Sequence, residues 1–362
     1  MRTIRDGVQP FLYESLPGRV VFGAGASREA LAGEVDKLGA SRVLLLATEQ
    51  EQSLAERLAK PLGERIVGLF TGVRPHVPIE VAREATQEAR RVDADCLLCV
   101  GGGSTTGAAK VIALETGLPI VAVPTTYAGS EMTPVYGLTE NGRKTTGKSM
   151  SVLPRVVVYD PELTFSLPDF VTGPSAINAL AHCVEALYAS GASPISSLMA
   201  GEGIRAIADG LPDAVSHPDG LAGRSKALYG TYLAGAAFAS AGGGVHHKIC
   251  HVLGGAYDLP HAETHTIILP HATALNRQAI PQIMARVAGA LGRDAAAEGL
   301  FDLAKEVGAP LALKEVGMKE GDLEEAVGLC LQAVPEDNPA KVGETEVRKL
   351  LKDAYEGKRP EQ

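Results

Sequence analysis

The first half of the chain alternates short apolar runs with segments of helical periodicity, and this alternation restricts the fold more than any other feature. We expect strands at RVVF, which starts at Arg19, and at residues 41–48, 65–70, 95–100, 119–124 and 155–161, with helices at 27–39, 52–62, 80–92 and 106–115. Ser27 is placed to cap the first of these helices. Apolar strands that alternate with helices at this spacing predict an α/β fold with a parallel, doubly wound sheet that is covered on both faces.

The periodicity changes after the run RVVVYDP, and apolar residues then recur at helical spacing. Helices are predicted at residues 174–190, 194–209, 221–241, 246–253, 280–291, 296–306 and 320–332. We therefore expect two domains: residues 1–162 form the α/β dinucleotide-binding domain, and residues 163–362 form an all-helical domain that carries the substrate site.

Composition narrows the class of partner. The chain has 362 residues, 45% of them hydrophobic, and a net charge of -9, which argues against a broad nucleic-acid or membrane footprint and favours small-molecule partners. We see no signal peptide and no apolar run as long as a membrane span. The five cysteines are too scattered for a disulfide framework, so we expect a cytoplasmic protein.

Two loops at neighbouring strand ends predict a dinucleotide site. The first, GGGSTTGAAK at residues 101–110, follows a buried strand and opens a helix, which is a geometry that binds phosphate. The second, PTTYAGSEMT at residues 124–133, clusters small residues and hydroxyls around one aromatic ring. A tight turn without a ligand is the alternative for either loop alone. The candidate cofactor contacts are Gly101, Gly102, Gly103, Ser104, Thr105, Thr125, Thr126, Tyr127 and Ser130, together with Thr48 and Glu49 at the end of the second strand.

Histidines concentrate in the second half: six of the nine lie within residues 246–271. His247 and His251 are four residues apart and share a helix face, and we expect Gly254 and Gly255 to end or bend that helix before Pro260 turns His261 back toward it. Asn178 and His182 show the same spacing on another helix. A solvated, incidentally histidine-rich helix end is the alternative. Three neutral imidazoles could hold a divalent metal, but the amide of Asn178 adds no negative charge, which weakens that case.

The chain resembles the iron-containing alcohol dehydrogenase family through four segments taken together: GGGSTTGAAK, PTTYAGSEMT, HHKICHVLGG and LPHAETH. The resemblance implies an oxidoreductase that uses NADH or NADPH. The chain departs from the metal-dependent members of the family at two positions. It has Asn178 where they have an aspartate ligand, and Gly107 where they usually have an aspartate. Within the family it is similar to the branch that reduces the double bond of maleylacetate to 3-oxoadipate in the degradation of aromatic compounds, a branch thought to work without metal. We therefore expect no metal, and we expect a homodimer.

This reaction needs groups that stabilise an enolate and bind two carboxylates. The candidate catalytic residues are His247, His251, Lys248, His182 and His261, and the candidate substrate contacts are Tyr127, Asn178, Arg143 and Lys148. The lysines near residue 148 could equally be solvated loop charges. A metal-dependent alcohol or polyol dehydrogenase of the same fold is the second hypothesis, and a nucleotide-binding sensor without turnover is the third.

Overall fold

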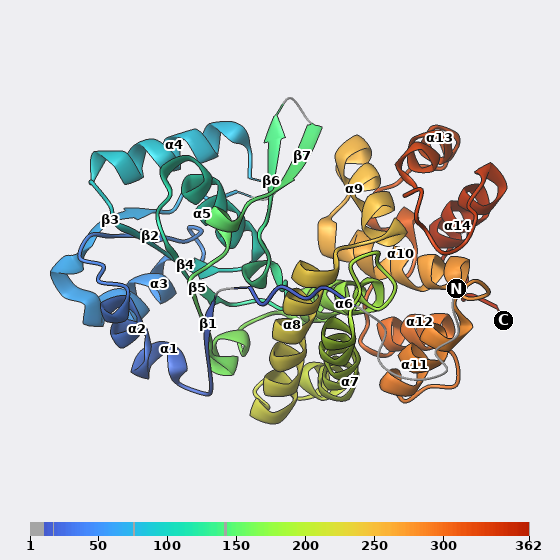
Figure 1. Ribbon diagram of the computed structural model, residues 1–362, viewed down its shortest axis with the longest axis horizontal. Coiled ribbons are helices and arrows are strands. Elements are labelled where there is room, and N and C mark those ends of the chain that lie inside the picture. Colours follow the sequence, from blue (N-terminus) through green and yellow to red (C-terminus); the bar gives the residue numbers. More distant parts are fainter. Residues whose placement is uncertain (1–10, 17, 75–76, 141–142, 362) are drawn as a thin grey trace.

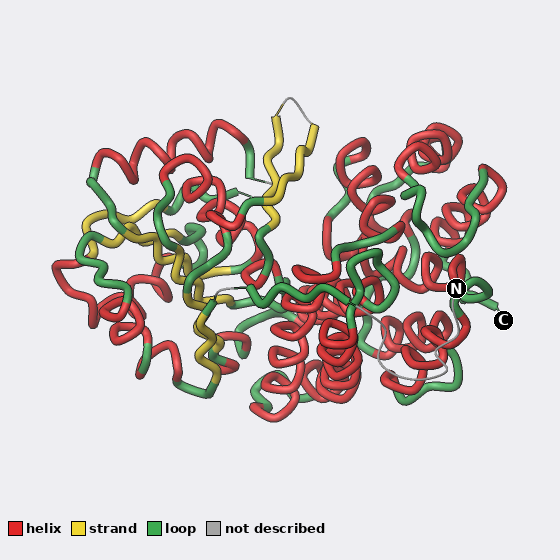
Figure 2. The backbone as a smooth tube through the Cα atoms, viewed as in Figure 1, coloured by secondary structure: helices red, strands yellow, loops and turns green. Residues whose placement is uncertain are grey.

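A computed structural model describes residues 11–16, 18–74, 77–140 and 143–361 of the chain. It contains a six-stranded parallel sheet in the order β1-β8-β5-β4-β2-β3, followed by a helical region (Figure 1). The strands are β1 (Arg19–Phe22), β2 (Val43–Leu46), β3 (Ile66–Phe70), β4 (Cys96–Gly101), β5 (Ile120–Pro124) and β8 (Val156–Tyr159). Figure 2 shows the strands gathered in one half of the molecule. The predicted fold class is confirmed.

The sheet is buried on both faces because its strands alternate apolar side chains between two cores. Leu44 and Leu46 face one core, and Val43 and Leu45 face the other. The first core is covered by helices α4 (Ile79–Arg91) and α5 (Gly103–Thr116), and the second by α1 (Ala26–Glu29), α2 (Leu31–Lys37) and α3 (Gln52–Ala59). This arrangement explains why the strand sequences read as continuous apolar runs.

Two details of this half differ from the prediction. The helix expected at residues 27–39 is interrupted at Ala30, and Ser27 does not cap it, because its Oγ donates a 2.5 Å hydrogen bond to Asp160. The lysines near residue 148 do not lie in a loop, because they belong to an antiparallel hairpin of β6 (Val135–Glu140) and β7 (Arg143–Lys148). The hairpin stands apart from the main sheet (Figure 1).

The second half contains no strand among the residues described after Tyr159. Its helices are α6 (Asp169–Ala186), α7 (Pro194–Ser216), α8 (Leu221–Ala241), α9 (Val245–Tyr257), α10 (His261–Asn276), α11 (Pro281–Leu291), α12 (Ala296–Glu306), α13 (Leu323–Ala333) and α14 (Glu344–Glu356). No helix in the described part of the chain is both long and apolar enough to cross a membrane.

Helices α9 and α10 depart from the prediction. Helix α9 continues through Gly254 and Gly255 and ends at Tyr257, where Asp258 adopts a left-handed conformation with φ of 52°. The sequence did not predict α10, because its side chains are buried almost all round and Pro270 interrupts its pattern. A helix without a polar face has no amphipathic periodicity by which it can be recognised.

Candidate active site

The glycine loop requires a residue without a side chain at Gly101. Its φ is 153°, and a Cβ at this position would lie 2.4 Å from Oγ1 of Thr105 and 2.6 Å from Oε2 of Glu51. Helix α5 begins at Gly103, with Gly102 as its N-cap, so the first backbone N–H groups have no partner within the helix. At the start of the helix, Gly102, Gly103 and Ser104 remain partly exposed. This end of the helix can accept a phosphate.

Lys110 joins the glycine loop to the second loop. Its ammonium group is fully buried and donates hydrogen bonds to the carbonyl oxygens of Ser130 (2.6 Å) and Val135 (2.7 Å) and to Oγ1 of Thr133 (3.0 Å). Burial lowers the pKa of Lys110 to about 7. Thr126 and Ser130 stay partly exposed. Lys110 thus fixes the position of the second loop, while side chains of that loop remain available to a ligand.

The carboxylate beside the glycine loop belongs to Glu51 and not to Glu49. Oγ1 of Thr48 donates to Glu51 (3.0 Å), and Oγ1 of Thr125 donates to its other oxygen (2.6 Å). Glu49 is exposed to solvent. Glu51 is therefore the glutamate that meets the glycine loop at this strand end, and the contact of Glu49 with the cofactor stays a prediction. The available signal was the spacing of Thr48 and Glu51, because a threonine three residues before a glutamate allows the hydrogen bond observed here.

Tyr127 was predicted to contact the cofactor and the substrate, but its side chain is buried among other residues. Its side chain has no exposed surface, and its hydroxyl donates to Oγ1 of Thr164 (3.0 Å) and accepts from the buried guanidinium of Arg224 (3.3 Å). This network joins the second loop to helix α8. The side chain of Tyr127 therefore anchors the loop to the protein interior. A hydroxyl with two buried partners is not available to cofactor or substrate.

Helix α6 carries a polar stripe through an apolar interior, formed by Ser175, Asn178, His182 and Glu185. These positions recur every three or four residues and so share one face. Oγ of Ser175 accepts the backbone N–H of Tyr127 (2.8 Å), and Nδ1 of His182 would lie 3.3 Å from a Cβ at Gly129. The stripe therefore starts at the second loop and leads toward the histidines of α9.

The histidines form one buried cluster at the end of this stripe. The rings of His182 and His247 are stacked, with centroids 4.9 Å apart and planes at 16°, and His265 lies 4.8 Å from His247. Nε2 of His246 and Nδ1 of His265 share a 2.9 Å hydrogen bond. His261 is exposed and lies 4.2 Å from His265 in ring centroids. His246 and His265 also belong to the cluster, although neither was predicted as a site residue.

Glu185 was also missed. Its carboxylate has no exposed surface and contacts the start of α9, where it accepts the backbone N–H of His246 (2.7 Å) and Nδ1–H of His247 (2.5 Å). The spacing of Glu185, three residues after His182, was the signal that could have identified it.

Other predicted residues lie at the edge of the cluster. His251 is partly exposed, and its ring centroid is 6.1 Å from that of His247. Lys248 is exposed, as is Lys148 on strand β7. Strand β7 contacts α9, so these two lysines belong to neighbouring elements. The side chain of Arg143 lies outside the described part of the chain.

Burial keeps most of the cluster neutral. It lowers the pKa of His182 and His265 well below 6.5 and lowers that of His246 to about 3, and the neighbouring imidazoles add to the effect. Eight buried side-chain atoms find no hydrogen-bond partner in the described structure, and five of them lie in the polar stripe and the cluster: Asn178 Oδ1, His182 Nδ1, His246 Nδ1, His247 Nε2 and His265 Nε2. Unpaired buried polar atoms are costly, so these atoms mark a place where a ligand binds.

One group of side chains in the cluster has the spacing of metal ligands. Among the described residues, the group of histidines, cysteines and carboxylates whose ligand atoms approach within 4.8 Å is His246, His247 and His265, which differs from the predicted set. Two of these rings are hydrogen-bonded to each other, and the third gives its Nδ1–H to Glu185. The group contains no carboxylate ligand to balance a metal charge.

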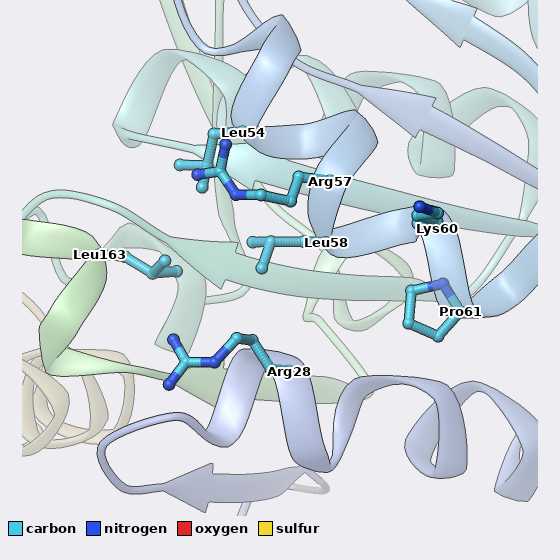
Figure 3. A pocket seen from close by; sticks show the side chains of 7 residues that line it. All are labelled: Arg28, Leu54, Arg57, Leu58, Lys60, Pro61 and Leu163. Carbon is cyan, nitrogen blue, oxygen red and sulfur yellow. The ribbon is translucent and has the colours of Figure 1, made fainter.

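A separate cavity of about 340 Å³ lies on the face of the sheet covered by α1 and α3 (Figure 3). Its lining combines three cationic side chains with leucine and proline: Arg28, Arg57, Lys60, Leu54, Leu58, Pro61 and Leu163. Arg28 is paired with Glu162 at 2.6 Å. None of these residues lies on the elements that carry the histidine cluster, so this cavity is not part of the candidate site.

Comparisons with known proteins cover nearly the whole chain. Residues 17–161 match the family model described as iron-containing alcohol dehydrogenase, and residues 172–355 match the C-terminal model of the same family. The maleylacetate reductase of Burkholderia cepacia is 51% identical over 97% of this chain and 99% of its own length. The structure of the maleylacetate reductase from Agrobacterium tumefaciens has a TM-score of 0.93, with 45% identity over 97% of this chain and all of its own. An iron-containing alcohol dehydrogenase from Corynebacterium glutamicum has a TM-score of 0.92, with 47% identity over 96% and 98%.

Proposed function

Because the chain belongs to the iron-containing alcohol dehydrogenase family, we propose that it is an oxidoreductase that reduces the carbon–carbon double bond of maleylacetate to give 3-oxoadipate. The observation that carries the proposal is the pairing of a phosphate-binding loop with a buried histidine cluster. Relatives named maleylacetate reductase, at 44–51% identity over nearly the full chain, support the substrate.

The cofactor is NADH or NADPH. Its pyrophosphate is expected at the start of α5, where Gly102 and Gly103 leave backbone N–H groups free. When bound, the dihydronicotinamide supplies the hydride. The second loop lies between this phosphate site and His182, and so the nicotinamide is expected near Gly129.

The histidines act on the substrate. Hydride addition to the alkene carbon β to the ketone places a negative charge on the ketone oxygen, and a proton must then reach the α carbon. Nε2 of His247 and Nδ1 of His182 are unpartnered in the described structure, and we assign to them the hydrogen bonds to the enolate or to a substrate carboxylate. Lys248 on α9 and Lys148 on the neighbouring strand β7 are exposed, and their positive charges would favour a dicarboxylate.

The reaction is proposed to need no metal, since the chain has Asn178 where a carboxylate ligand would balance the charge. Purified enzyme with maleylacetate and either cofactor is expected to oxidise the cofactor at an unchanged rate after treatment with a chelator. His247→Ala is expected to lower kcat by about 10²-fold or more, with cofactor affinity nearly unchanged. Metal analysis completes the assay: activity that disappears on chelation and returns with iron or zinc would establish the metal-dependent alcohol dehydrogenase instead.

The assembly and the compartment are also proposals. Strand β1 is an edge strand of the sheet, its Phe22 is 39% exposed, and Leu12 in the segment that precedes it in the chain is 90% exposed; these features support a homodimer. Sedimentation of the full chain should give twice the chain mass of 37.7 kDa, and a monomer would contradict it. The five cysteines are free and buried, which supports a reducing cytoplasm.

A further inference from the structure

Glu185 connects two parts of the site through its two carboxylate oxygens. Oε1 accepts the backbone N–H of His246 at 2.7 Å, and Oε2 accepts Nδ1–H of His247 at 2.5 Å. An ionised carboxylate only accepts hydrogen bonds, so Nδ1 of His247 must carry a proton. Burial raises the pKa of Glu185, but the adjacent charge and hydrogen bond of His247 outweigh burial and lower it, which keeps the carboxylate ionised.

The fold provides a built position for this carboxylate. Helix α9 begins at Val245, and the N–H of His246 in its first turn donates to this carboxylate, where the helix dipole favours an anion. The two preceding glycines leave the necessary room, because a Cβ at Gly244 would lie 3.0 Å from Oε1 and a Cβ at Gly243 would lie 3.2 Å from Oε2. The start of α9 therefore positions Glu185, and Glu185 in turn positions the ring of His247.

The ring of His247 is restrained on its other sides as well. His182 is stacked on it at 4.9 Å, and Phe238 packs against it at 4.6 Å between ring centroids. Only Nε2 remains, and this buried nitrogen has no hydrogen-bond partner among the described residues. The orientation of His247 thus leaves one nitrogen for chemistry.

We propose that Glu185 is a positioning residue for the reduction: it fixes His247 with a proton on Nδ1 and so presents Nε2 to the substrate. The inference rests on the proposed function. A proton taken up at Nε2 gives an imidazolium beside the ionised carboxylate of Glu185. When the substrate enolate is protonated, the N–H bond at Nε2 breaks, a C–H bond forms at the α carbon, and the neutral ring keeps its Nδ1–H bond to Glu185.

Glu185→Gln tests this role because glutamine has one acceptor oxygen, whereas three donors face residue 185: the backbone N–H of His246, Nδ1–H of His247 and the hydroxyl of Tyr188 (3.2 Å). The amide can serve the N–H of His246 or that of His247, and it places its own NH₂ group against the other. We expect kcat to fall by about 10²-fold, the size of effect seen when one aligned donor is lost, with the cofactor dissociation constant changed by less than about threefold. Glu298→Gln is the matched control, since Glu298 is a buried glutamate on α12, away from the site.

A double-mutant cycle separates positioning from folding. If Glu185 acts through His247, adding Glu185→Gln to His247→Ala should lower kcat by less than about threefold further. An equal loss in both backgrounds would overturn the proposal and would leave Glu185 a merely structural role.

A second measurement needs no substrate and no Glu185 variant. ¹⁵N NMR of the histidine-labelled enzyme, with the His247 signal assigned by its loss in His247→Ala, should show Nδ1 protonated in the wild type. A wild-type His247 protonated on Nε2 alone would contradict the positioning role. Absence of turnover by the wild type with maleylacetate would refute the proposed substrate, while the NMR result would still decide the role of Glu185.

Discussion

Single side chains in a loop can be placed correctly in sequence and still point away from the ligand. Tyr127 lies in the loop predicted to hold the cofactor, yet its hydroxyl is committed to Thr164 and Arg224. Glu49 follows the expected strand, yet Glu51 meets the glycine loop. The local φ and ψ angles set the direction in which each side chain of a turn points, and a sequence motif does not specify these angles.

The sharpest residue-scale prediction concerns Gly102. A Cβ there would lie 2.9 Å from Cγ2 of Thr126, so Gly102→Val should push the two loops apart and block the close backbone approach to a pyrophosphate. We expect the cofactor dissociation constant to rise about tenfold or more, equivalent to about 1.4 kcal/mol, with the circular dichroism spectrum unchanged. Gly33→Val is the control, because a Cβ at Gly33 meets nothing within 4 Å. Unchanged cofactor affinity in a folded Gly102→Val enzyme would remove this loop from the site.

At the scale of elements, α6 connects the cofactor loop to the histidine cluster. Its interior is apolar except for one polar stripe, and each end of the stripe has a different partner: Ser175 contacts the second loop and Glu185 contacts α9. A helix is rigid over this length, so the separation between loop and cluster is set by the helix and not by the flexible segments around it.

Ser175→Ala tests this connection. The substitution leaves the buried N–H of Tyr127 without its 2.8 Å acceptor, which should cost about 1–3 kcal/mol shared between folding and loop position. Isothermal titration should show cofactor binding weakened a few fold, and urea titration should show a smaller free energy of unfolding. Ser240→Ala provides the comparison, since Oγ of Ser240 bonds only to the carbonyl of Ala236 in its own helix. Equal cofactor affinities for the two variants would argue against a role for α6 in placing the loop.

At the scale of the whole molecule, buried histidines make the free energy of unfolding depend on pH. Burial lowers the pKa of His271 from 6.5 to about 4, and His271 lies on α10 outside the cofactor loops. Between these two pH values the unfolded chain binds a proton that the folded chain does not. The free energy of unfolding must therefore fall as the pH drops from 6.5 toward 4, and this contribution is fully present only above 6.5.

Replacing His271 by glutamine should reduce that dependence. From pH 7 to pH 5, the wild type should lose about 1–2 kcal/mol more unfolding free energy than His271→Gln, as linkage predicts for one such group. Urea titrations at the two pH values measure the difference. His217→Gln is the matched control, because the side chain of His217 is 72% exposed. If the wild type and His271→Gln lost the same unfolding free energy between pH 7 and pH 5, His271 would not contribute to the pH dependence of stability.

The sequence by itself determined the elements whose signal is local. The buried strands read as apolar runs, and the helices at residues 221–241 and 296–306 were predicted with the bounds that α8 and α12 have. The glycine loop was recognisable because a helix that opens on free N–H groups needs small residues at its start. Periodicity and backbone preference act within a few residues, so they can be read without the fold.

The tertiary structure alone decided which polar side chains meet. Glu185 and His247 are 62 residues apart, and their contact depends on the packing of α6 against α9. Helix α10 is buried on nearly every side, so its own sequence lacks the polar face that marks a helix, and His265 joins the cluster only through its packing. Contacts between distant segments depend on how whole elements pack, and no short stretch of sequence contains that information.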